Sequence, residues 1–277
     1  MRVGLVQLSS SDDPSENLLV TASYIKQASD SGARLVATPE VTNCVSLSRK
    51  TQMEVLREES EDPTLQALQI AARENNVWVL IGSLALKSRD SDGRFVNRSF
   101  MIDPTGEVCA RYDKIHMFDV SLSAAETYRE SDGYRPGDQS VVTYVEDTKV
   151  GLTICYDLRF PYLYRTLAQA GAKILTVPSA FAEKTGAAHW ETLLRARAIE
   201  TGSYILAPAQ CGEHPSSTGR ARRTYGHSLA VSPWGEVLVD GGNMPGVFMV
   251  DLDLSAVDDV RSRLPSLSHD VRYKGPE

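Results

Sequence analysis

The chain has 277 residues, of which 42% are hydrophobic and 23% are charged, a composition typical of globular proteins. A compact chain of this length buries about 75% of its unfolded surface, so its core requires neither disulfides nor metals. The formal net charge of −7 argues against a nucleic-acid partner, because nucleic-acid-binding surfaces are normally basic.

The cysteines and the N-terminal segment give expectations about metals and location. No cysteines are paired as C-x-x-C or stand at zinc spacing from histidines, so we expect no metal; the four are Cys44, Cys109, Cys155 and Cys211. The N-terminal MRVGLVQL lacks a signal-peptide pattern, and no run of 18 apolar residues predicts a membrane span. We therefore expect a cytoplasmic protein with free thiols and no membrane association.

Strands and helices are expected to alternate in the first half of the chain. The apolar run at 2–8 predicts a buried strand, and Asp13-Pro14 predicts the start of a helix that continues to about Ala28. The next expected elements are a strand at 34–38, a helix at 64–74, a strand at 77–84, and strands at 95–102 and 107–112 around a D-P-T-G turn.

The second half repeats this order. The expected elements are strands at 150–155, 173–177 and 203–207, helices at 161–169 and 189–200, strands at 227–232 and 236–239 around a turn, a closing strand at 247–252 and a short helix from about 255. Alternating strands and helices predict the α/β class. Two similar halves further indicate two sheets packed on each other, with helices outside, in a single domain over 1–277.

Two segments do not fit this pattern. Residues 119–138 are long, polar and aperiodic, and such loops are usually functional or disordered. The tail from Ser262 is irregular, and we expect it to pack on the core or on a partner.

Three reactive side chains follow predicted strands. Glu40 comes after LVATP, Lys114 after EVCARYD and Cys155 after VGLTI, and ligands of α/β sheets bind beyond such strand ends. A thiol is mostly protonated at neutral pH and needs a base. A carboxylate in a dry pocket has a raised pKa and can act as that base, while an ammonium group can stabilise an oxyanion.

Each residue alone also has an ordinary structural interpretation. Cys155 fits a buried core position, Glu40 a turn and Lys114 the surface. A Cys–His pair that uses His116, His189 or His227 is another possibility, although these histidines fit positioning or core roles better. The segment GHSLA at 226–230 reads as a strand, and the sequence contains no phosphate-binding glycine loop.

Three segments together resemble a known family. LVATPE, RYDKIHMFD and GLTICYDLRFP are similar to the signature segments of the nitrilase, or carbon–nitrogen hydrolase, superfamily, and the resemblance extends over nearly the whole chain. The segments ending in APAQCG and beginning with TYGHSLAVSPWGEVL resemble the Nit branch, most closely the Nit1-type deaminated-glutathione amidases.

This resemblance implies a four-layer α-β-β-α sandwich, a homodimer, and no metal or organic cofactor. It also implies that Glu40, Lys114 and Cys155 are catalytic. A second glutamate that supports the lysine matches Glu130, although Glu126 is close enough in the sequence to leave the choice open.

The implied reaction is a thiol-dependent hydrolysis. The terminal amide of a small carboxylate-bearing substrate would be converted to acid plus ammonia through a cysteine thioester, with deaminated glutathione as the candidate substrate. The alternatives are an ω-amidase acting on α-ketoglutaramate-like substrates, a nitrilase or N-carbamoylase on the same triad, and a catalytically idle scaffold.

Three further residues are expected to meet the substrate. The backbone N–H of Tyr156 would stabilise the oxyanion, and Arg159 and Phe181 would line the substrate site. A second interpretation of Arg159 pairs it with Asp157, so that the two side chains brace the turn that carries Cys155.

Overall fold

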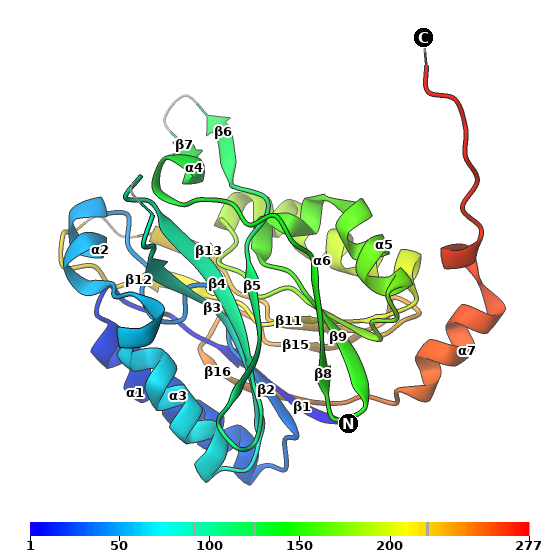
Figure 1. The fold of residues 1–277 in the computed structure, drawn as a ribbon, viewed down its shortest axis with the longest axis horizontal. Coiled ribbons are helices and arrows are strands. Elements are labelled where there is room, and N and C mark those ends of the chain that lie inside the picture. Colours follow the sequence, from blue (N-terminus) through cyan, green and yellow to red (C-terminus); the bar gives the residue numbers. More distant parts are fainter. Residues whose placement is uncertain (91, 124–125, 220–221, 277) are drawn as a thin grey trace.

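The computed structural model describes residues 1–90, 92–123, 126–219 and 222–276, and the side chains at 122, 123 and 126 lie outside this description. Two six-stranded sheets form its centre (Figure 1). The strand order in the first sheet is β16 (Gly246–Asp251), β1 (Arg2–Gln7), β2 (Leu35–Ala37), β3 (Trp78–Lys87), β4 (Phe95–Ile102) and β5 (Val108–Asp113).

The second sheet has a matching arrangement. Its order is β15 (Val237–Asp240), β14 (Leu229–Val231), β11 (Tyr204–Ala207), β10 (Ile174–Thr176), β9 (Thr148–Leu152) and β8 (Val141–Val145). In both sheets three parallel strands are flanked by antiparallel ones. The repeated halves expected from the sequence are therefore present.

Helices cover the outer face of each sheet (Figure 1). The helices α1 (Pro14–Asp30) and α3 (Pro63–Glu74) lie on the first sheet, and α5 (Pro161–Gln169) and α6 (Glu183–Thr201) lie on the second. The side chain of Asp13 accepts a hydrogen bond from Ser15 N and so begins α1. The α/β class and the layered α-β-β-α sandwich are confirmed.

The alternation of side chains along β1 shows how the layers pack. Val3 and Leu5 belong to the apolar cluster that joins the two sheets, which also contains Leu152 and Leu175. Val6, on the opposite face of β1, belongs to a second apolar cluster, which contains residues of α1 and α3. Because successive side chains of a strand point to opposite faces, one buried strand contributes to two cores.

Several elements were not expected from the sequence. The segment 119–138 forms a hairpin of β6 (Asp119–Ser123) and β7 (Glu126–Arg129), followed by the short helix α4 (Glu130–Gly133). A second hairpin joins β12 (Cys211–His214) to β13 (Arg222–Tyr225). The edge strand β8, the helix α2 (Arg49–Val55) and the short helices η1 (Glu59–Glu61), η2 (Cys155–Arg159) and η3 (Ser266–Ser268) complete these additions.

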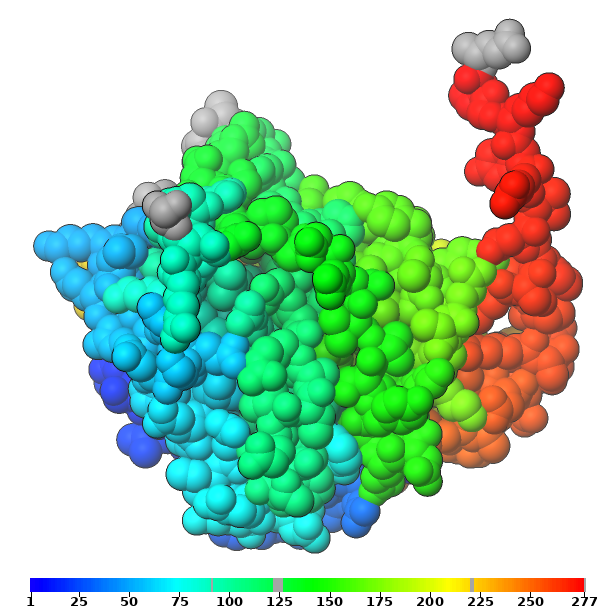
Figure 2. Space-filling view, in the orientation of Figure 1, coloured from blue at the N-terminus to red at the C-terminus, as the bar shows by residue number. Residues whose placement is uncertain are grey.

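The end of the chain leaves the body of the fold. After α7 (Ser255–Arg263) and η3, Asp270 still binds Arg165 and Gln169 of α5. Beyond this contact the chain runs outward, as the red segment of Figure 2 shows. Among the residues described, no helix combines the length and the apolar character needed to cross a bilayer.

Candidate active site

The three predicted residues meet at one cavity. It has a volume of about 410 Å³, and Glu40, Lys114, Glu130 and Cys155 all lie in its wall. Glu40 follows β2 after a short turn, Lys114 directly follows β5, and Cys155 lies three residues beyond β9. The cavity thus lies where strands of both sheets end, as the topology of α/β proteins favours.

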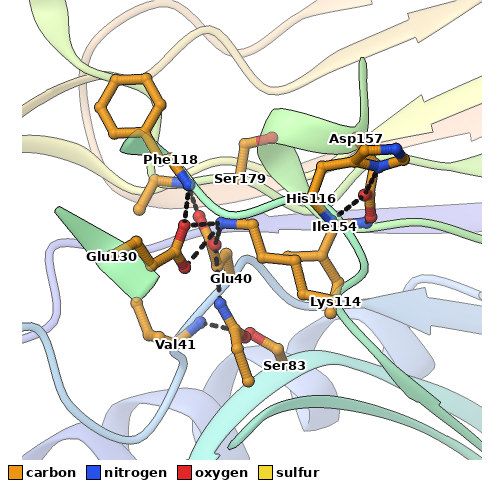
Figure 3. Close-up of polar contacts among 12 residues, drawn as sticks. Glu40, Val41, Ser83, Lys114, His116, Phe118, Glu130, Ile154, Asp157 and Ser179 are labelled. Carbon is orange, nitrogen blue, oxygen red and sulfur yellow. Dashed lines mark hydrogen bonds and ion pairs between the residues drawn. The ribbon is translucent and has the colours of Figure 1, made fainter. Parts of the chain in front are cut away.

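Lys114 lies between two carboxylates (Figure 3). Its Nζ is 2.9 Å from Oε1 of Glu40 and 2.9 Å from both carboxylate oxygens of Glu130. Only 2% of the lysine side chain is exposed. Glu130 also accepts a hydrogen bond from Phe118 N at 2.6 Å, so it ties the loop after β5 to the lysine. The alternative residue Glu126 starts β7, and its side chain lies outside the described part of the chain.

Two further groups hold the Glu40 carboxylate. Asn97 Nδ2 donates to Oε1 at 2.9 Å, and Ala180 N donates to Oε2 at 2.8 Å. Asn97 also accepts a hydrogen bond from Lys114 N through its backbone oxygen, so one residue positions both charged groups. Its buried Oδ1 has no hydrogen-bond partner and belongs to a side chain in the cavity wall. Nothing in the sequence pattern around Asn97 indicated this role.

A bulge in β3 positions the turn that carries Glu40. The pairing of β3 with β4 shifts between Ile81 and Leu84, and Ser83 Oγ there accepts a hydrogen bond from Val41 N at 2.8 Å. A Cβ at Gly82 would lie 2.0 Å from Thr38 O, so only glycine allows this approach. Val41 has a φ of 47°, a strained value for a β-branched residue, which the surrounding contacts maintain.

Cys155 lies on a sharp turn at the start of η2. Its φ is 49°, and its N–H donates to Pro178 O at 3.0 Å. The first N–H groups of a helix have no acceptor within the helix, so the N–H of Tyr156 is not needed for the η2 hydrogen bonds. β9 ends at Leu152, earlier than the expected strand end at 155, because the chain turns to present the thiol.

Asp157 braces this turn. The fully buried carboxylate accepts hydrogen bonds from Ile154 N, Tyr112 Oη and His116 N at 2.8, 2.7 and 3.1 Å, and His116 Nδ1 lies 2.6 Å away. Figure 3 shows His116 and Ile154 converging on it. The bracing interpretation of Asp157 is correct, but its expected partner Arg159 is wrong, because His116 and Tyr112 supply the contacts.

The electrostatics fix the protonation states. Burial raises the pKa of Glu40, but the Lys114 ammonium outweighs burial, so the pKa lies below its ordinary value. Burial, the Glu40 charge and a hydrogen bond to Glu40 raise the pKa of Cys155 well above its ordinary value. Burial lowers the pKa of Lys114, but the Glu130 and Glu40 carboxylates outweigh it and raise the pKa. At neutral pH the set is therefore carboxylate, ammonium and thiol.

This result corrects one expectation. A dry pocket alone would raise the pKa of the Glu40 carboxyl, as the sequence argument expected. The opposite direction follows because an ammonium group lies 2.9 Å from the carboxylate, which residue order alone does not reveal.

The expected substrate-binding residues divide into two groups. Tyr156 and Phe181 line the cavity, whereas Arg159 is absent from its described wall. The Arg159 guanidinium lies 5.9 Å from the Tyr156 ring centre and 5.5 Å from that of Phe181. Its Nη2 is 3.3 Å from Nδ1 of His189.

The alternative Cys–His pair receives no support from the described cavity wall. It contains none of the three histidines that the sequence offered, His116, His189 and His227. Among the described residues, no cluster of three or more histidine, cysteine, aspartate or glutamate side chains has a geometry that could hold a metal.

Comparison with known proteins shows which family the whole chain resembles. The family model for carbon–nitrogen hydrolases matches residues 2–262. The deaminated glutathione amidase of Yersinia enterocolitica is 40% identical over 269 residues, which cover 96% of this chain and 92% of that protein.

Solved structures are similar over nearly the whole chain. The C. elegans NitFhit protein has a TM-score of 0.88 at 33% identity, and the match covers 97% of this chain and 64% of that chain. A mutant amidase from Nesterenkonia sp. AN1, with acrylamide added to its active-site cysteine, has a TM-score of 0.77 at 27% identity, covering 96% and 98% of the two chains. The family resemblance inferred from the three signature segments is confirmed.

Proposed function

Because the chain belongs to the carbon–nitrogen hydrolase family, we propose that its cavity is the active site of a thiol-dependent amidase with Glu40, Lys114 and Cys155 as catalytic residues. The chain is a hydrolase that acts on amide carbon–nitrogen bonds. The observation that carries the residue assignment is the convergence of a buried carboxylate, a buried ammonium and a thiol on one cavity.

The acylation step follows from the protonation states. Glu40, ionised at rest, takes the proton of the Cys155 thiol as the sulfur attacks the amide carbonyl carbon. The negative charge that develops on the carbonyl oxygen is stabilised by the Lys114 ammonium and the N–H of Tyr156. The carbon–nitrogen bond then breaks, and Glu40 returns the proton to the departing nitrogen.

Deacylation uses the same groups. Water loses a proton to Glu40 and attacks the thioester carbonyl, and Lys114 again faces the oxyanion. The carbon–sulfur bond breaks, the acid leaves, and the proton on Glu40 returns to the Cys155 sulfur. Glu130 contributes by holding Lys114 in place through both of its oxygens.

We propose deaminated glutathione as the substrate, because relatives at up to 40% identity carry that activity in their names. A cavity of about 410 Å³ is within the usual range for small-molecule sites. Deaminated glutathione has no primary amide, so cleavage of the amide between its γ-carbonyl and its cysteine nitrogen would release a peptide amine, in place of the ammonia that the sequence resemblance implied. The ω-amidase alternative, with α-ketoglutaramate as substrate, would release ammonia. The nitrogen product and the rate of hydrolysis therefore both distinguish the two candidate substrates.

The assembly and location are also proposals. A homodimer is supported by the tail that stands away from the body (Figure 2), because it carries Val271 and Tyr273 with 76% and 90% exposure. Light scattering coupled to size exclusion tests this directly. A single domain over 1–277, a cytoplasmic location, and the expected lack of nucleic-acid and membrane partners stay predictions.

The test combines kinetics with detection of the acyl-enzyme. Hydrolysis of deaminated glutathione and α-ketoglutaramate is followed by chromatography in the wild-type protein and in Cys155→Ala. We expect turnover to vanish in Cys155→Ala at an unchanged unfolding midpoint, and an acyl adduct to map to Cys155 by mass spectrometry. Cys109 is exposed and Cys155 is buried, so peptide mapping is needed to separate the two thiols.

Three results would contradict this proposal. Substantial activity in the alanine variant would overturn the nucleophile assignment. A strong preference for α-ketoglutaramate would overturn the substrate. No hydrolysis and no adduct across both substrates would favour the scaffold alternative.

A further inference from the structure

The cavity wall carries more positive charge than the proposed chemistry uses. Besides Lys114, three arginines line it, namely Arg49, Arg129 and Arg222. The acids in the described wall are Glu40, Glu130 and Asp132, of which the first two pair with Lys114. This local excess of cations occurs in a chain whose net charge is −7, so the cavity is suited to an anionic ligand.

Arg222 is the best placed of these three cations. It is the first residue of β13, where it pairs with His214 of β12, and its side chain is half-buried in the cavity wall. Its Nη2 donates to Ala180 O at 2.7 Å. Among the described residues, no carboxylate forms an ion pair with it, so most of its five N–H donors are available to a ligand.

Its neighbour Arg223 shows the contrast. Successive side chains of a strand point to opposite sides, and Arg223 points outward. It lies 3.1 Å from Glu183 and 3.2 Å from Glu213, so its charge is already paired. The two arginines therefore differ in environment at adjacent positions, and Arg223 provides a matched control.

The other two arginines in the wall are less suitable. Arg49 donates to Gly133 O and Gly93 O and lies with its guanidinium 3.6 Å from the centre of the Phe95 ring. Arg129 is exposed on the β7 hairpin. Neither combines partial burial with a free guanidinium edge as Arg222 does.

Arg222 also lies close to the reacting groups. Ala180 accepts a hydrogen bond from Arg222 through its oxygen and donates to Glu40 through its nitrogen. The Arg222 charge contributes to lowering the pKa of Glu40. A carboxylate bound at Arg222 would therefore lie near the scissile amide.

We propose that Arg222 binds a carboxylate of the substrate and so makes the enzyme selective for anionic amides over neutral ones. A guanidinium fork matches the two oxygens of a carboxylate, which a single ammonium does not. This inference rests on the proposed amidase function and identifies the charge of its substrate. A rival role is purely positional, with Arg222 acting only through Ala180 on Glu40.

The experiment compares one amide with and without its charges. Steady-state rates are measured on deaminated glutathione and on its dimethyl ester, in wild type, Arg222→Met, Arg222→Lys and Arg223→Met. Selectivity is the ratio of the two kcat/KM values. We expect it to fall at least about 30-fold in Arg222→Met, as when one partner of a buried charge pair is removed, and mainly through KM. It should stay within about threefold in Arg223→Met, whose position is exposed.

The outcomes separate the possible roles. A fall in selectivity in Arg222→Lys, which keeps the charge and loses the fork, supports carboxylate binding and can be measured even where Arg222→Met folds poorly. Where both variants fold, the fall should be smaller in Arg222→Lys than in Arg222→Met. Equal losses on both substrates, or no change in selectivity, overturn the inference and leave the amidase function standing. A wild-type protein that hydrolyses neither compound overturns deaminated glutathione as the substrate, and one that also fails on α-ketoglutaramate overturns the proposed amidase function itself.

Discussion

Replacement of Lys114 by methionine would test how the buried charges are balanced. The lysine Nζ lies 2.9 Å from oxygens of both Glu40 and Glu130. The variant leaves these two carboxylates facing one cavity, with side chains only 5% and 15% exposed. Removing one partner of a buried ion pair destabilises a protein by about 3–5 kcal/mol. We expect a loss of about 3 kcal/mol in the free energy of unfolding, because Asn97 and Ala180 still donate to Glu40.

The loss should depend on pH. In the wild type the pKa of Glu40 is lowered in the folded state, so its contribution to stability is present above its unfolded pKa and is lost as pH falls through the folded pKa. Without Lys114, burial becomes the dominant influence and raises the folded pKa above the unfolded one. Ionisation of Glu40 then opposes folding, so the variant should lose more stability at pH 8 than at pH 5.

Urea unfolding followed by tryptophan fluorescence at both pH values measures these quantities. The control is Lys173→Met, because Lys173 pairs with Asp258 at the surface, where the side chains are 32% and 66% exposed. Such pairs contribute about 0–1 kcal/mol. The reasoning is refuted if Lys114→Met is no less stable than Lys173→Met, or if its loss of stability is the same at both pH values.

Three other predictions concern groups around the triad. Because the pKa of Glu40 lies below its ordinary 4.5, kcat/KM should stay nearly constant as pH falls from 7 to about 5. A pH–rate profile in which kcat/KM falls with a midpoint above pH 6 would contradict this. Asn97→Leu removes a donor to Glu40 and should lower kcat about 10-fold or more, whereas an unchanged kcat would show that Ala180 suffices. Asp157→Ala leaves its buried donors unpaired and should lower the free energy of unfolding by about 3 kcal/mol; a urea midpoint equal to that of wild type would remove Asp157 from its bracing role.

The sequence was most informative at strand ends. Glu40, Lys114 and Cys155 could be found because each follows a predicted strand, and the ends of such strands meet at one edge of an α/β fold. The elements with clear periodicity also matched, and α5 spans 161–169 in both the prediction and the structure.

Residues that act across the fold could not be found in this way. Asn97 lies inside a strand and meets Glu40 over a separation of 57 residues, and nothing in its local pattern marks that contact. Arg222 and Arg223 look alike in the sequence, and only the register of β13 shows which one faces the cavity. The expected pairing of Asp157 with Arg159 failed for the same reason, since its partners Tyr112 and His116 come from β5 and from the loop that follows β5.

The division of the site between the two sheets has a practical consequence for protein fragments. Glu40 and Lys114 follow strands of the first sheet, Cys155 follows a strand of the second, and β16 returns from the C-terminal half to pair with β1. A chain divided between residues 138 and 139 would give two pieces, neither of which holds the whole triad. Amide hydrolysis would reappear only when the pieces reassemble with their sheets in register, so turnover itself would serve as a complementation signal for the docking of the two halves.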